Sequence, residues 1–205
     1  LVYEQNTSQR LIFYSPESVK AEVSGVILER LRLTLDEKER ESPIPPSQFT
    51  SAMLQQRLEA HHARVIDGLQ SEAKVIEGVY QHRFEAELAL MGWAGAAAGL
   101  FFLAAEAGSG KTNLLAHLLV RYTELGYPTL LLRGNRMSKN SLEAELRHVL
   151  NLREDAPLEA YAGLLGTQDC PLMVLVDGGN EHPNPSGLLQ SAVALAEAHP
   201  GGGLK

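Results

Sequence analysis

The chain has 205 residues, of which 44% are apolar and 21% charged, and this suits one substantial core or one core with a smaller helical part. The formal charge of −7 argues against a nucleic-acid-binding protein, because such proteins usually present a net basic face to the phosphates. The one cysteine, Cys170, cannot form a disulfide within the chain, which favours a reducing compartment and a cytoplasmic location.

The two ends of the sequence suggest a fragment of a longer protein, because it starts at Leu1 without a signal segment and closes in the glycine run 201–203. One uncharged run, 88–105, has about the length of a membrane helix. Glycines and alanines fill its centre and no basic residue flanks it, so we expect two shorter buried elements there and no membrane contact.

The amino-terminal part is predicted to begin with two short extended pieces, 1–4 and 10–14, around a polar turn. Apolar residues at helical spacing then predict helices over about 15–39 and about 47–75. The proline-rich segment 42–47 cannot continue a helix and is predicted to form a stiff extended linker, the best candidate for a domain boundary.

After Gly78 the pattern alternates between helices and buried strands, which is typical of a three-layer α/β unit with a parallel sheet. We therefore divide the chain into a helical amino-terminal region of unknown family, 1–78, and an α/β domain, 79–205. Asn140 and Glu143 are expected to form a capping box. The predicted strands are 100–104, 128–132 and 172–176, and the predicted helices are 83–93, 112–125, 140–150, 158–165 and 187–198.

The segment 105–112 fits the phosphate-binding loop G-x-x-x-x-G-K-[ST], except that alanine replaces the first glycine at a position that needs only a small residue. The two glycines let backbone N–H groups converge on a phosphate, Lys111 adds a charge for the β- and γ-phosphates, and the Thr112 hydroxyl can coordinate Mg²⁺. The predicted ligand is ATP, with GTP as the less favoured alternative. The predicted binding residues of the loop are Ala105, Glu106, Ala107, Gly108, Ser109, Gly110, Lys111, Thr112 and Asn113.

The third predicted strand ends at an acid, Asp177, which we expect to hold Mg²⁺ together with Thr112. Glu181, in the loop that follows, is a candidate general base, so the predicted catalytic set is Lys111, Asp177 and Glu181. Arg133, after the second strand, is a candidate phosphate contact at the same sheet edge. Each has a simpler alternative: Asp177 a turn cap, Glu181 a solvated loop acid and Arg133 a solvated arginine.

The residues 106–115, together with 177–181, resemble the STAND class of signal-transduction NTPases, in particular its bacterial NACHT-like members. The resemblance covers roughly residues 79–205, and its phosphate-loop half is the more specific. Asn180 departs from the pattern, because NACHT proteins often have a second aspartate there. Glu181 is then the one extra acid of this loop.

This resemblance implies a P-loop NTPase core that binds ATP or ADP with Mg²⁺ and hydrolyses ATP slowly. In such proteins the nucleotide acts as a conformational or oligomerisation switch, with self-association or other domains of the full-length chain as partners. The resemblance also implies that Val79, Tyr80 and Arg83 pack near the adenine, whereas the simpler alternative is an ordinary helix start. Two other functions stay open: a nucleotide-binding interaction module that does not hydrolyse, and a phosphotransferase.

A zinc site is not expected from the sequence. His61 and His62 are neighbours on a predicted helix and are expected to point to different faces, while His182 and His199 have no partner at ligand spacing.

Overall fold

The structure, a computed structural model, describes residues 2–5, 11–14, 43–75, 80–96, 99–106, 108–199 and 203–205. The chain divides into two compact units, Leu1–Ser42 and Pro43–Lys205. In the first unit, β1 (Val2–Gln5) pairs antiparallel with β2 (Leu11–Tyr14), so the two extended pieces predicted there are confirmed. The helix predicted over 15–39 lies outside the described residues.

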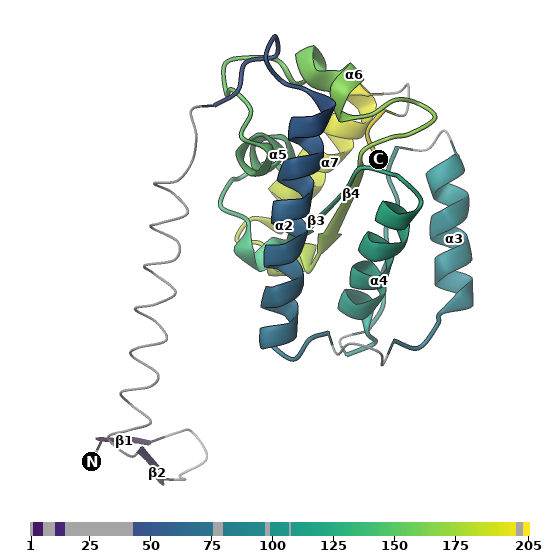
Figure 1. Ribbon diagram of the computed structural model, residues 1–205. Helices are drawn as coiled ribbons and strands as arrows, with labels where there is room; N and C mark the ends of the chain where they lie inside the picture. The colour runs from purple at the N-terminus through teal and green to yellow at the C-terminus, as the bar shows by residue number, and fades with distance from the viewer. Residues whose placement is uncertain are drawn as a thin grey trace. The chain divides into compact units, whose positions relative to one another are not determined.

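The second unit is an α/β structure with a parallel strand pair (Figure 1). Its strands are β3 (Thr129–Arg133) and β4 (Met173–Asp177), and its helices are α2 (Ser51–Ser71), α3 (Phe84–Gly95), α4 (Lys111–Glu124), α5 (Leu142–Leu150), α6 (Ala162–Leu165) and α7 (Pro185–Ala198). Short 3-10 turns lie at Gly134–Arg136, Leu158–Tyr161 and Gly179–Glu181.

The two strands carry helices on both faces, because successive side chains of a strand point to opposite sides. Leu130 and Leu132 pack into a core that also holds buried residues of α2, α5 and α7. Leu131 and Leu175 pack into a second core with residues of α3 and α4. The strands are in register from Thr129 and Met173 to the neighbouring pair Arg133 and Asp177, so the polar residues that end them lie side by side.

The strand predicted at 100–104 is wrong for this structure, because residues 99–106 are described but form no strand. The physical reason is that a strand exists only through the hydrogen bonds of a neighbour, which apolar character alone does not supply. A different segment lies along β4: the Leu172 N–H donates to the Gly203 carbonyl at 3.0 Å, and the Lys205 N–H donates back to the Leu172 carbonyl at 2.9 Å. This pairing is parallel, like that of β3 and β4.

Helix α2 covers the outer edge of β3. The His61 ring Nε2–H donates to the Leu131 carbonyl at 2.8 Å, and His62 reaches the Thr129 carbonyl in the same way. The expectation that the two histidines point to different faces is therefore wrong, because backbone acceptors on one strand satisfy both rings. Covering an edge in this way blocks unwanted strand pairing.

Because α2 packs on β3, it belongs to the same compact unit as the predicted phosphate loop. The division of this chain falls between Ser42 and Pro43, at the start of the predicted proline-rich linker, and not at residue 78 where the sequence pattern changes. A helix covering a sheet edge has the same apolar pattern as a helix of a separate domain, so the sequence could not show this difference.

The start of α5 differs by one residue from the prediction. The hydroxyl of Ser141, not the Asn140 side chain, caps the helix by accepting from the Ala144 N–H at 3.2 Å. Glu145 accepts from the N–H groups of Ser138 and Lys139, so a carboxylate does hold this turn, but from a different position. As for a membrane crossing, none of the helices in the described ranges combines the length and apolar character that it needs.

The contact of α2 with β3 predicts that acid destabilises the unit. Burial lowers the pKa of His61 from 6.5 to about 4, so the folded state keeps this ring neutral while the unfolded chain protonates it below its ordinary pKa. The stabilisation is therefore present above pH 6.5 and is lost progressively as the pH falls from 6.5 to 4. Thermal unfolding followed by circular dichroism across this range is expected to show a falling midpoint.

The matched variant for this test is His61→Gln, which keeps a donor for the Leu131 carbonyl and removes the titration. It should flatten the pH dependence, although His62, whose pKa is also lowered by burial, keeps a part of it. Identical pH profiles for the variant and the wild type would contradict the assignment.

Candidate nucleotide-binding site

The predicted phosphate loop lies directly before α4. Gly108 and Gly110 have φ angles of +75° and +82°, a left-handed conformation that side chains other than glycine rarely adopt. The Ser109 N–H donates to the Glu106 carbonyl at 3.2 Å, which closes the turn between them. Ala107 lies outside the described residues. The loop thus presents the amino end of a 14-residue helix, where anions are favoured.

Lys111 reaches back across this loop. Its ammonium donates to the carbonyl oxygens of Ala105 at 2.6 Å and Glu106 at 2.8 Å. The charge is therefore held at the loop and is not extended into solvent. Asn113 follows in the first turn of α4, where it is half-buried.

Thr112 and Asp177, the two predicted metal ligands, are in contact although 65 positions separate them. The Thr112 hydroxyl lies 2.9 and 3.1 Å from the two carboxylate oxygens of Asp177. Asp177 is buried, with 9% of its surface exposed. A hydroxyl beside a carboxylate is an oxygen donor set of the kind that Mg²⁺ prefers, so the residues present fit this ion.

Glu181 lies above the end of β4. Gly178 has a φ of +64°, and a Cβ there would stand 3.2 Å from the carboxyl carbon of Glu181, so this side chain folds back over the glycine. Glu181 is exposed, and both Glu181 and Asp177 lie near enough to Arg133 to interact with its charge. The sequence-predicted acids are therefore neighbours at one sheet edge.

Arg133 forms an ion pair with Glu72, the residue that follows the end of α2. Its guanidinium forms a two-fold ion pair with Glu72, with Nη1 2.9 Å from Oε1 and Nη2 bonded to Oε2. This hydrogen bonding holds the pKa of Glu72 down at about 2. Because the arginine side chain is buried in this pair, its predicted role as a phosphate contact finds no support here, and Glu72 is a partner that the sequence did not reveal.

The loops that follow β3 and β4 touch through their backbones. A Cβ on Gly134 would stand 2.2 Å from the Gly178 carbonyl oxygen, which is closer than any side chain can approach. His182, in the second loop, also contacts the first, with its ring Nε2 3.2 Å from the Lys139 carbonyl oxygen. These contacts fix the backbone around Asp177.

The segment before α3 lies beside the phosphate loop. A Cβ on Gly110 would stand 2.7 Å from Nη2 of Arg83, so this guanidinium rests on the loop, close to the predicted phosphate position. Tyr80 is less open to a base: its ring stacks on His117 with centroids 4.1 Å apart, and its hydroxyl donates to Glu87 at 2.6 Å. Val79 lies outside the described residues.

A cavity of about 440 Å³ adjoins the loop and is mostly apolar. Lys111 and Asp177 lie at its polar part, whereas Trp93, Phe101 and Leu195 are among its apolar walls. Residues 99–103 and 174–180 both border it. The volume would suit a ligand, and the candidate site is the part of the cavity near Lys111 and Asp177, because these residues also belong to the predicted phosphate and metal site.

Comparison with known proteins adds no relative to this picture. No protein-family model matches the chain, and no curated protein or solved structure matches it. The resemblance to NACHT-like NTPases therefore stays a prediction from the loop and the Asp177 segment.

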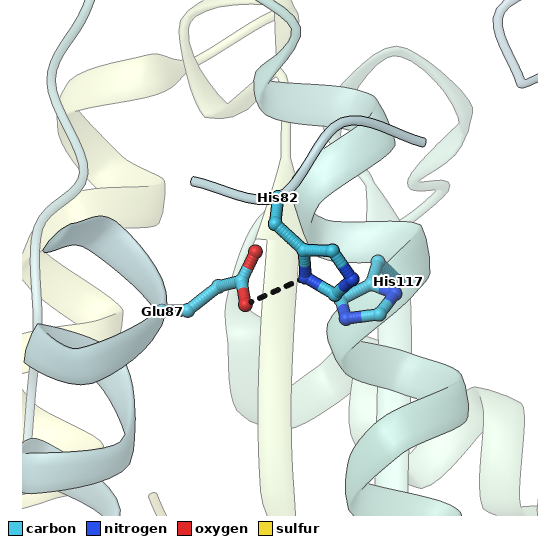
Figure 2. A group of neighbouring side chains, drawn as sticks. All are labelled: His82, Glu87 and His117. Atoms are coloured by element: carbon cyan, nitrogen blue, oxygen red, sulfur yellow. Dashed lines mark hydrogen bonds and ion pairs between the residues drawn. The ribbon is translucent and has the colours of Figure 1, made fainter. Parts of the chain in front are cut away.

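The sequence did not reveal the polar group His82, Glu87 and His117, which the structure brings together beside the loop (Figure 2). Neighbouring positions before and within α3 supply the first two, but His117 lies on α4. No spacing rule joins residues that meet only through the packing of two helices.

Proposed function

We propose that this chain binds ATP with Mg²⁺ at the segment 105–112 and at Asp177, and hydrolyses it slowly as a conformational or oligomerisation switch in the cytoplasm. The observation that carries the proposal is the contact of Thr112 with Asp177 at 2.9 Å. A phosphate-binding loop and an acid at the end of a neighbouring strand can hold the same ion only if they are in contact. Thr112 and Asp177 are in contact.

Each part of the loop has a task in such binding. The backbone N–H groups around Gly108 and Gly110 and the start of α4 receive the phosphates. Lys111 exchanges its carbonyl partners for phosphate oxygens, and Arg83, resting on Gly110, adds a second cation. Thr112 and Asp177 would hold Mg²⁺, and the ion would supply positive charge against the phosphates.

The same proposal includes a three-layer P-loop core. Helices on both faces of the parallel pair support it, and so does the parallel segment 203–205 on the far side of β4. The proposed family, NACHT-like NTPases, rests on the sequence of residues 106–115 and 177–181.

The proposed hydrolysis has a specific alternative, which is nucleotide binding without turnover. Glu181 is exposed and folded over Gly178, and its neighbour Asn180 carries no charge, which favours a slow ATPase or a nucleotide-binding interaction module without turnover. A phosphotransferase is the less favoured alternative. Self-association and contact with other domains are the proposed outputs.

Titration with ATP, by calorimetry in Mg²⁺ and again in excess chelator, tests the binding site. Asp177→Asn is expected to weaken ATP binding at least ~10-fold in Mg²⁺, the size of a lost hydrogen bond to a charged group, and much less in chelator. The control is Asp169→Asn, an exposed carboxylate distant in sequence from the loop. Equal losses with and without Mg²⁺ would make Asp177 a structural residue and remove the basis of the proposal.

A further inference from the structure

Three side chains of metal-binding type converge between α3 and α4. His82 lies just before α3, Glu87 in its first turns and His117 on α4, and one potential ligand atom of each lies within 4.8 Å of the others (Figure 2). The segment before α3, α3 itself and α4 thus supply one side chain each, and none of the three belongs to the phosphate loop.

The Glu87 carboxylate is held in place by the protein. Its Oε1 accepts from the Tyr80 hydroxyl at 2.6 Å and from the Arg83 N–H at 2.8 Å, while Oε2 lies 3.2 Å from Nδ1 of His82. The bond from Tyr80 is the main reason why the pKa of Glu87 falls to about 2. One oxygen is therefore anchored, and the other is an ionised donor that faces the group.

His117 is held by stacking. Its ring lies nearly parallel to that of Tyr80, with an interplanar angle of 12°. Burial lowers the pKa of His117, and an imidazole nitrogen of this ring is a potential metal ligand. The His82 side chain is 56% exposed and leaves one side of the group open to water.

We propose that His82, Glu87 and His117 bind a divalent ion of the zinc class, with water at the remaining position. Two imidazoles and one carboxylate favour Zn²⁺ or Co²⁺ over Mg²⁺, which prefers oxygen donors. Tyr80 is the positioning residue, because it donates to Glu87 and stacks on the ring of His117. The ion would join α3 to α4, the helix that begins at the phosphate loop.

This proposal does not rest on nucleotide binding, and the test uses metal alone. The metal-free chain is titrated with Zn²⁺ by calorimetry and with Co²⁺ by visible absorption, which reports the coordination number. One saturable equivalent is expected, together with a rise in the thermal unfolding midpoint. Glu87→Gln and His117→Gln are each expected to weaken binding at least ~10-fold, and Tyr80→Phe about 10-fold at unchanged stoichiometry.

Two matched variants serve as controls: Glu85→Gln, on the same helix, and His148→Gln, on α5, should both bind like the wild type. If His117→Gln fails to fold, His82→Ala gives the same answer, because His82 is exposed and outside the core. Weak binding of several ions, equal losses in the control variants, or no saturable binding would each overturn the metal site. The three side chains would then be a polar network that joins α3 to α4.

Discussion

Replacing Lys111 with alanine is expected to abolish ATP binding and to leave the fold intact. The ammonium is the charge that the loop offers to the β- and γ-phosphates, and a hydrogen bond between charged groups contributes up to about 3 kcal/mol, or about 100-fold in affinity. Its carbon chain belongs to neither core, and it is half-buried. Calorimetric titration with ATP and Mg²⁺ measures the loss.

Circular dichroism of the same variant checks the fold, since the removed contacts are two hydrogen bonds to loop carbonyls. Lys139→Ala is the control, because this lysine pairs with the exposed Glu154. Unchanged ATP affinity in the Lys111 variant would show that the loop is not the nucleotide site.

Glu181→Gln is expected to keep ATP affinity near that of the wild type and to lower turnover by ~10²-fold or more. This is the size of a lost general-base contribution, and the glutamine retains the shape of the side chain without its basicity. The hypothesis rests on the position of the carboxylate over Gly178, beside Asp177. Phosphate release under saturating ATP, with binding measured in parallel, separates the two effects.

Two results of this experiment have different meanings, and a control variant accompanies them. A variant that releases phosphate as fast as the wild type leaves Glu181 a solvated loop acid. A wild type that binds ATP without releasing phosphate favours the interaction module over the ATPase. Glu159→Gln, an exposed acid of another loop, should change neither quantity.

The sequence predicted those strands and helix starts whose whole pattern lies within one segment. The apolar runs before Arg133 and Asp177 predicted β3 and β4, and the start of α4 followed from the loop motif. Residues 100–104 have the same apolar character and form no strand, because pairing depends on a partner from elsewhere in the chain. The sequence of one segment does not show which other segment will pair with it as a strand.

Contacts between distant segments were predictable only when a known chemical task joined them. The proposed Mg²⁺ site requires Thr112 and Asp177 to lie together, so their contact could be expected. Nothing in the sequence joins Glu72 to Arg133, or His61 to the Leu131 carbonyl, although these contacts attach α2 to the sheet edge. They depend on how a helix packs, and many helices with the same apolar pattern would pack elsewhere.

Because the backbones of Gly134 and Gly178 are in contact, we expect the loop after β3 and the loop after β4 to move together. Neither loop can move toward the other, because no side chain lies between them to be compressed or to change rotamer. A displacement of the Asp177 loop toward β3 would therefore press on the loop after β3 and, through the contact of His182 with Lys139, on the turn before α5. In the proposed nucleotide site, these contacts would carry a displacement of the Asp177 loop to the start of α5.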